Sequence, residues 1–330
     1  MAKDNEQRSY PMTLNDNKKQ SIFTKPVILT LIALLCCALW GSATPAIKTG
    51  YRLLEIEGVP SIMLFAGIRF FLAGVLTVII FSIARRRFLY PKKENIGRVL
   101  TVASVQTVIQ YVLFYLGLAY TTGVKGTVAS GTNAFFAVLI AALIFRQEKL
   151  TAKKIIACAM GFVGIVIINL NGLSLSGNAL ELVGVILVVL STIAYAFSSV
   201  LIKRYSAFED PVTISGYQFI VGGLFMALVG LISGGTISFA NIGGIVDLIY
   251  LAFLSAIAYS LWGILLKHNP VSRVTVFSCS IPIFGTLLTM LFLSGESDAV
   301  NPINLVITLL LVSSGILLLN YHKPEKNNKI

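Results

Sequence analysis

Ten apolar segments follow one another along this chain, and most are close to the ~20 residues that a helix needs to cross a ~30 Å hydrocarbon core. They are expected at 26–48, 59–83, 96–118, 122–145, 155–170, 182–202, 212–233, 245–266, 274–293 and 303–320. The segments lack the alternating pattern of barrel strands. Helices are the other way to pair every backbone polar group in lipid. The sequence therefore predicts an all-α integral membrane protein with ten transmembrane helices.

The composition agrees with that prediction. The chain is 56% hydrophobic and 12% charged, whereas a soluble domain carries roughly 25% charged residues. Its mean hydropathy is +0.85. A water-soluble core of this length cannot hide so much apolar surface, so lipid is expected to be the solvent around most of the chain.

Basic residues gather in one set of predicted loops. With ten crossings, the two tails and the even-numbered loops share one side, and that side holds 22 of the 26 Lys and Arg residues. The other side holds Lys48, Arg52 and Lys125, and Arg69 lies inside a span. Basic short loops stay in the cytoplasm, so both termini are predicted to be cytoplasmic, with the chain in the plasma membrane. Contact with anionic lipid explains the net charge of +12 better than a nucleic-acid partner does.

The chain contains a similar pattern twice. A shift of 148 residues gives ten identities over positions 111–148, among them Tyr111 with Tyr259 and Glu148 with Glu296. Five spans per copy is an odd number, so the second copy must enter the membrane from the opposite side. Two such inverted copies usually enclose a substrate site near the midplane.

The sequence thus predicts two inverted five-helix repeats with short flanking parts. The expected divisions are a cytoplasmic tail at 1–25, the first repeat at 26–170, a polar connector at 171–181, the second repeat at 182–320 and a cytoplasmic tail at 321–330.

These features resemble the EamA family of the drug/metabolite transporter superfamily. The residues that carry the resemblance are Trp40-Gly41 followed by Lys48, Arg69-Phe70, a small-residue fourth span ending in Glu148, and Pro282 followed by Glu296. The resemblance covers nearly the whole chain outside the tails. It implies a ten-helix secondary carrier, often an exporter of amino acids or other metabolites.

One position departs from the family pattern. The fourth span of the family usually carries a proline that matches Pro282, whereas this chain has Ala134 beside Asn133. A helix break is therefore expected to be missing in the first repeat, so that the gating of the two halves need not be symmetric.

Arg69 is the most informative single residue, since it lies about ten positions into the second span. A charged side chain there costs ~2.5–3.5 kcal/mol on insertion scales and usually faces a cavity or a partner. A guanidinium can grip a carboxylate or phosphate with two hydrogen bonds, which predicts an anion anchor. The alternatives are a structural arginine that caps helix carbonyls and one that snorkels outward.

Polar and aromatic residues inside the spans are predicted to face the bundle interior. The candidates for substrate binding are Trp40, Thr44, Arg69, Gln110, Tyr111, Asn133, Tyr195, Gln218, Tyr259, Trp262 and Ser278. For each, the alternative role is a hydrogen bond between helices, worth ~0.6 kcal/mol on average. The repeat-related tyrosines, Tyr111 and Tyr259, are predicted to guard opposite ends of one cavity.

Pro45 and Pro282 are predicted to interrupt their spans, either as hinges or as plain kinks.

Acidic residues are expected only near the span ends. Glu181 and Asp247 fall at predicted outer edges, and Glu148 and Glu296 fall just past helix ends. A buried carboxylate is the usual proton-relay group of transporters and would also hold a cationic substrate. Its absence favours neutral, zwitterionic or anionic substrates over organic cations. Glu148 is expected to form an ordinary salt bridge, with Lys149 or Lys153 as its partner.

No catalytic, metal or cofactor pattern emerges from the sequence. The four cysteines, Cys36, Cys37, Cys158 and Cys279, lie inside spans and are expected to serve as packing residues. No Gly-rich phosphate loop with Lys and Ser/Thr follows a strand, so this chain is not expected to hydrolyse ATP. No cofactor, no metal and no enzymatic activity are predicted.

The predicted function is a secondary transporter, as an exporter, of a small polar metabolite such as an amino acid. The expected mechanism is alternating access, and the expected partners are the small-molecule substrate and membrane lipid. The sequence leaves the oligomeric state open, with a homodimer as one option. The alternatives are a drug or toxic-compound exporter of the same fold, an intramembrane enzyme, and a channel.

Overall fold

The computed structural model describes residues 21–121, 123–168, 170, 179–292 and 301–320, and within these ranges the chain forms ten helical segments and no strand. Seven segments are uninterrupted: α1 (Pro26–Leu53), α2 (Gly58–Ala84), α7 (Ala152–Ile168), α8 (Ala179–Tyr205), α9 (Pro211–Ile232), α10 (Ile242–His268) and α13 (Pro302–Asn320). The prediction of an all-helical multi-pass membrane protein is confirmed.

The other three segments change their helical pitch or break. The third runs through α3 (Ile96–Val102), a π-helical stretch η3 (Ala103–Ile109) and α4 (Gln110–Tyr120). The fourth and ninth segments are built from α5 (Gly123–Ser130), α6 (Asn133–Leu139) and the π-helical η4 (Ile140–Ile144), and from α11 (Val271–Thr275), the 3-10 stretch η6 (Val276–Ser280) and α12 (Ile281–Phe292).

Length separates the segments that qualify as membrane spans from those that do not. Seven helical runs in the described ranges are long and apolar enough to cross a membrane, and the third segment is one of them. The fourth, fifth and ninth are shorter: α7 has 17 residues, and the other two are interrupted. Irregular backbone at membrane depth is tolerated where protein surrounds it.

Local sequence signals set several helix starts. Asp210 accepts a hydrogen bond from the Thr213 amide at 3.2 Å, directly before the proline that begins α9. Asn241 caps α10 in the same way, accepting from the Gly243 amide at 2.8 Å. An Asp or Asn side chain before the helix accepts from an amide that lacks a helical partner, and a proline at the first helical position has no amide to satisfy.

The fourth segment breaks without a proline, contrary to the expectation from Ala134. A turn at Gly131 and Thr132 separates α5 from α6, and the Thr132 hydroxyl donates to the Ala129 carbonyl at 2.6 Å. A Cβ at position 131 would lie 2.6 Å from the Ile165 side chain. Glycine at position 131 therefore permits the close approach of α7. The two repeats therefore both carry an interrupted segment.

The prolines behave differently from each other. Helix α1 continues through Pro45, and a role of this proline as a hinge or a kink stays a prediction. Pro282 is the second residue of α12, and Ile281 separates it from η6. Because Pro282 has no amide to donate to the preceding turn, it stands where the 3-10 stretch gives way to the α-helix.

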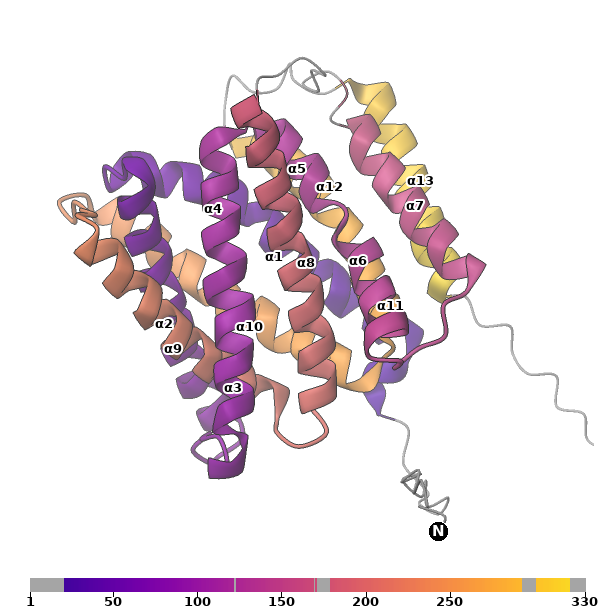
Figure 1. Cartoon of the computed structure of the whole chain (residues 1–330), viewed down its shortest axis with the longest axis horizontal. Helices are drawn as coiled ribbons and strands as arrows, with labels where there is room; N and C mark the ends of the chain where they lie inside the picture. Colours follow the sequence, from indigo (N-terminus) through magenta and orange to yellow (C-terminus); the bar gives the residue numbers. More distant parts are fainter. Residues whose placement is uncertain (1–20, 122, 169, 171–178, 293–300, 321–330) are drawn as a thin grey trace, which may run out of the picture.

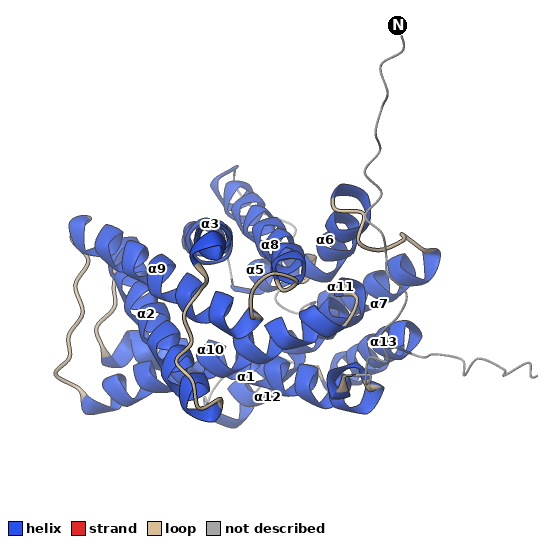
Figure 2. Cartoon of the chain, turned by 90° about the horizontal axis from the view of Figure 1, so that it is seen from below, coloured by secondary structure: helices blue, strands red, loops and turns tan. Residues whose placement is uncertain are grey.

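The helices form two layers closed at each side by a helix pair. Helices α4, α8 and α6 lie in one layer and α10, α1 and α12 in the other, with α2 beside α9 at one side and α7 beside α13 at the opposite side (Figures 1 and 2). Each layer draws helices from both halves of the chain. The interior is thus shared by the halves rather than divided between them.

Helices α2 and α9 pack closely and run in opposite directions. A Cβ at Gly74 would come within 2.5 Å of the Gly216 carbonyl, and Gly223 abuts the backbone at Gly67. Later residues of α2 therefore meet earlier residues of α9, which makes the two helices antiparallel. Such backbone contact is possible because small residues line the interface.

Most described basic residues that the sequence assigned to one side lie at one end of the bundle. Arg85 pairs with Asp210 at 2.8 Å, and Lys203 donates to the Asn269 carbonyl at 2.5 Å. At the other end, Lys125 pairs with Glu181 at 2.7 Å.

Candidate functional site

A cluster of aromatic rings occupies the centre of the bundle, where helices of both halves meet. We call it the aromatic cluster, and its members are Trp40, Phe70, Tyr111, Tyr115, Phe219, Tyr259 and Trp262. The rings touch at centroid distances of 4.4 Å for Phe70 with Tyr111 to 5.8 Å for Tyr111 with Tyr115. Helix α1 contributes Trp40, which stands edge-on to two rings of α10.

Residues related by the sequence repeat touch each other inside this cluster. The Tyr111 and Tyr259 hydroxyls are 2.7 Å apart, and these two positions are 148 residues apart in sequence. Phe70 stacks on Phe219, its counterpart in the second repeat, at 5.1 Å. The two tyrosines therefore form one hydrogen-bonded pair and do not lie apart at opposite ends of a cavity, as the sequence predicted.

Arg69 is buried beside the cluster, with 3% of its surface exposed. Its Nη2 donates to the Ser255 hydroxyl on α10 at 3.0 Å, and its guanidinium lies 5.0 Å from the Phe70 ring centroid. The burial excludes snorkelling, and the hydrogen bond goes to a side chain rather than to a helix carbonyl. Its Nε has no hydrogen-bond partner among the described residues.

The counterpart of Arg69 makes a matching contact. Gln218 accepts a hydrogen bond from Thr107 at 2.5 Å, and Thr107 precedes Ser255 by the repeat spacing of 148 residues. The two polar pairs therefore occupy related places, but only one carries a charge. The positive charge of Arg69 makes the two halves of the site chemically unequal.

Several buried polar atoms near the cluster lack a partner within the described part of the chain. They are the indole nitrogens of Trp40 and Trp262, the amide oxygens of Gln106 and Gln110, the amide nitrogen of Gln218 and the hydroxyl of Ser260. Buried polar groups are usually hydrogen-bonded, so unpaired ones need an explanation. A polar ligand that enters between the helices is one such explanation.

The remaining predicted residues are distributed unevenly. Tyr195 packs against the aromatic cluster from α8. Asn133 and Ser278 meet each other instead, with the amide donating to the hydroxyl at 3.3 Å between α6 and η6. Thr44 lies on α1, and its side chain is outside what the structure describes. No metal-binding group of three or more His, Cys, Asp or Glu side chains occurs in the described ranges.

The sequence did not single out Thr107 and Ser255, and it placed Asp247 only at a span edge. Both hydroxyl residues are fully buried, and each pairs with a polar residue of the other repeat. The signal that could have found them is their mutual spacing of 148 residues, because a shift that aligns identical residues also aligns similar ones. Asp247 lies in the second turn of α10, half-buried.

Glu148 joins the two halves at the basic end of the bundle. Its carboxylate accepts hydrogen bonds from the Ser272 amide at 3.2 Å, from the Ser272 hydroxyl at 2.5 Å and from Lys154 at 2.6 Å. A salt bridge of Glu148 was expected, and it forms with Lys154 rather than with Lys149 or Lys153, the examples that the sequence suggested. Burial acts to raise the pKa of Glu148, but the hydrogen bonds and the charge of Lys154 outweigh it and lower the pKa. The repeat-related Glu296 lies outside the described residues.

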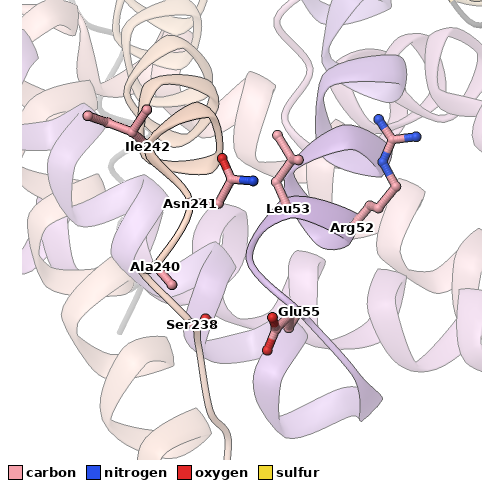
Figure 3. Close-up of a pocket in the computed structure, with 7 residues that line it drawn as sticks. All are labelled: Arg52, Leu53, Glu55, Ser238, Ala240, Asn241 and Ile242. Carbon is pink, nitrogen blue, oxygen red and sulfur yellow. The ribbon is translucent and has the colours of Figure 1, made fainter.

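A surface pocket of about 560 Å³ opens at the opposite end, between the loop after α1 and the loop before α10. Figure 3 shows Asn241 and Leu53 facing each other across it, with Glu55 close to Ser238. None of the predicted substrate residues lines this pocket. Next to the pocket, the buried Leu54 packs on Gly244 of α10.

Comparison with protein families gives two matches to one model. The model of the EamA-like transporter family matches residues 27–170 and 182–321. Several similar curated proteins are uncharacterized transporters. The one in the sor 3' region of Acidianus ambivalens is 28% identical over 68% of this chain and 82% of its own length. One from Archaeoglobus fulgidus is 26% identical over 78% and 87%.

Two further likenesses extend over most of the chain. The uncharacterized transporter YvbV of Bacillus subtilis is 25% identical over 78% of this chain and 82% of its own length. A protein of known crystal structure superposes with a TM-score of 0.72 at 17% identity, over 88% of this chain and 96% of that chain. At this identity the structural likeness concerns the fold alone.

Proposed function

Because the chain belongs to the EamA-like transporter family, we propose that it exports a small polar metabolite that carries a negative group, such as an amino acid. The substrate binds at the aromatic cluster, with its anionic group on Arg69. The energy source is an ion or substrate gradient, and the protein is placed in the plasma membrane.

The single observation that carries this proposal is the buried guanidinium. A desolvated cation is costly unless a negative partner or a set of acceptors compensates it. Arg69 has one hydroxyl acceptor and an aromatic face, and its Nε has no partner in the described part of the chain. Carboxylate is the group that a guanidinium fork fits best, and the aromatic rings offer an apolar wall for the rest of the molecule.

The mechanism is alternating access by two inverted repeats. The opposite directions of α2 and α9 support inversion, as does the meeting of Tyr111 with Tyr259. A residue can touch its own counterpart only near the rotation axis that relates the two copies. A site on that axis can be reached from either face by rocking of the two halves.

The sidedness follows from charge. Basic loops favour the cytoplasm, so the end that holds Arg85, Lys154 and Lys203 faces inward. At that end Glu148 and Lys203 bridge separate segments, which supports a conformation closed toward the cytoplasm.

Counterflow in liposomes tests the proposal. Purified protein is reconstituted into vesicles loaded with each of the twenty L-amino acids, and entry of the labelled form is followed. Saturable uptake that is stimulated by the trapped amino acid is expected for at least one of them. Movement of cationic dyes with no movement of amino acids or organic acids would favour the drug exporter, and high flux without saturation would favour a channel.

The variant Arg69→Gln tests in the same assay whether Arg69 binds the substrate. Glutamine already occupies the counterpart position 218, so the fold accommodates this side chain at the equivalent place in the second repeat. Loss of a hydrogen bond to a charged group, worth about 1.5–3 kcal/mol, predicts a KM raised about 10- to 100-fold. An unchanged KM for every anionic or zwitterionic substrate would remove Arg69 from the site.

A further inference from the structure

Asp247 is an acidic side chain on the inner face of α10 that the site described above does not use. The residue is half-buried in the second turn of the helix. Its Oδ2 is buried and has no hydrogen-bond partner among the described residues. A buried carboxylate oxygen accepts hydrogen bonds strongly, so leaving it unpaired is costly.

A glycine makes room for this carboxylate. A Cβ at Gly50 of α1 would lie 2.6 Å from Asp247 Oδ2 and 3.3 Å from the Phe65 ring of α2. Only hydrogen at position 50 lets the carboxylate enter the crevice between α1 and α10. The oxygen therefore sits where three helices of the interior meet.

Asp247 and Arg69 both lie on elements that pack against each other, α10 and α2. Phe65 precedes Arg69 by one turn of α2, and Asp247 precedes the Arg69 partner Ser255 by two turns of α10. The eight residues from Asp247 to Ser255 rise about 12 Å along the helix axis. The long Arg69 side chain, which reaches Ser255, spans part of that distance.

The other charged and titratable groups near Asp247 are few. Helix α1 carries Tyr51 next to Gly50, with Lys48 and Arg52 at its exposed end, and α2 contributes Arg69. Helix α9 has no Asp, Glu, Lys or Arg between Pro211 and Ile232. Within these elements Asp247 is the one acidic side chain in contact with the interior crevice.

We propose that Asp247 binds the ammonium group of the substrate while Arg69 binds its carboxylate, so that the site selects zwitterionic amino acids. This inference rests on the proposed transport function and adds the residue for the second charge. A ligand with only a carboxylate leaves Asp247 unpaired and repelled by the added anion. A ligand with only an amine leaves Arg69 without its partner. Both charges together satisfy both buried groups.

The test compares Asp247→Asn with the wild type in binding and in counterflow. Trp40 and Trp262 are the only two tryptophans of the chain, and both belong to the aromatic cluster, so intrinsic fluorescence reports on the site. The probe is the non-aromatic L-amino acid with the strongest wild-type counterflow, together with its analogue without the amino group. Glu57→Gln is the matched control, because that carboxylate is exposed at the same end.

Loss of a charge-assisted hydrogen bond predicts that Asp247→Asn weakens amino-acid binding about 10- to 100-fold. The same variant should bind the analogue without the amino group at least as well as the wild type does. Glu57→Gln should leave both values unchanged. Gly50→Ala, which keeps every charge but pushes the carboxylate aside, should also weaken amino-acid binding, and it replaces Asp247→Asn if that variant does not fold.

Three outcomes are separable. Equal amino-acid affinity in the wild type, Asp247→Asn and Gly50→Ala would overturn the role of Asp247 and leave the transport proposal intact. Equal weakening for the amino acid and its analogue would also overturn it, because the loss would then be structural. No wild-type counterflow with any amino acid would overturn the substrate class and this inference together.

Discussion

At the scale of single residues, the most informative contacts are those between a side chain and its own counterpart. The hydroxyls of Tyr111 and Tyr259 share one hydrogen bond, and the rings of Phe70 and Phe219 stack. Neither residue of such a pair can be assigned to one half of the site. Two polar pairs flank the axis that relates the two repeats: Arg69 with Ser255, and Gln218 with Thr107. The first pair is charged and the second is neutral.

The tyrosine pair should behave as a unit. Tyr111→Phe and Tyr259→Phe each remove the one hydrogen bond that joins them, so the double variant should be little worse than either single variant. A coupling of about 0.5–1.5 kcal/mol in thermal stability is expected, the size of one neutral hydrogen bond. Melting of the purified single and double variants measures it. Strictly additive losses would mean that the hydroxyls do not pair.

At the scale of helices, α2 and α9 depend on the absence of side chains. Gly74 touches the Gly216 carbonyl and the Ile220 backbone, while Gly223 lies on the backbone at Gly67. In lipid no hydrophobic force draws helices together, so close packing of small residues supplies much of the attraction. These two helices therefore fix the relation between the halves at one side of the bundle.

Gly74→Ala should destabilise the protein although alanine is the better helix former. Its Cβ would lie 2.5 Å from the Gly216 carbonyl and 2.6 Å from the Ile220 amide nitrogen, so the helices must separate. Overpacking of this kind costs about 1–3 kcal/mol. Gly97→Ala is the control, since a Cβ there meets nothing within 4 Å. A melting temperature of Gly74→Ala equal to that of Gly97→Ala would contradict the close packing.

The Glu148 bridge predicts a pH dependence of stability. Hydrogen bonds from Ser272 and Lys154 outweigh burial and lower the pKa of Glu148 in the folded state, whereas an unfolded glutamate titrates near about 4.3. The bridge thus stabilises fully above that pH, and its contribution is lost as the pH falls through the lower folded pKa.

Thermal melts of the wild type and Glu148→Gln between acidic and neutral pH measure that contribution. The melting temperatures should differ most at neutral pH and converge in acid. Glu57→Gln, which changes an exposed carboxylate, should follow the wild type throughout. A constant gap between the wild type and Glu148→Gln at every pH would show that the carboxylate charge is not what stabilises the contact.

At the scale of the whole molecule, the two ends of the bundle differ in charge and in contacts. One end gathers Arg85, Lys154 and Lys203 with their acidic and carbonyl partners. The other end holds the surface pocket and the pair of Lys125 with Glu181. The charge difference sets the expected orientation in the membrane.

Cysteine labelling of intact cells tests that orientation. The four native cysteines are buried, so their background reaction should be low. A membrane-impermeant maleimide should label Glu57→Cys and should spare Lys93→Cys until the membrane is permeabilised, because both positions are exposed but lie at opposite ends. Labelling of Lys93→Cys from outside, with Glu57→Cys protected, would reverse the proposed topology.

The sequence alone determined that the chain is helical and crosses the membrane many times, because hydropathy over ~20 residues depends on composition and not on contacts. It also pointed to the spacing of 148 residues and to Arg69, since a charge inside an apolar run is visible without a fold. A local pattern misjudged one break, because the turn at Gly131 occurs without a proline.

Only the tertiary structure decided which residues meet. It brought Tyr111 onto Tyr259, gave Arg69 its partner Ser255, and paired Glu148 with Ser272 and Lys154. It also showed that Gly50 opens a place for Asp247. Such contacts depend on how helices pack across the interior, and packing is set by the shapes of distant side chains together, which no local stretch of sequence contains.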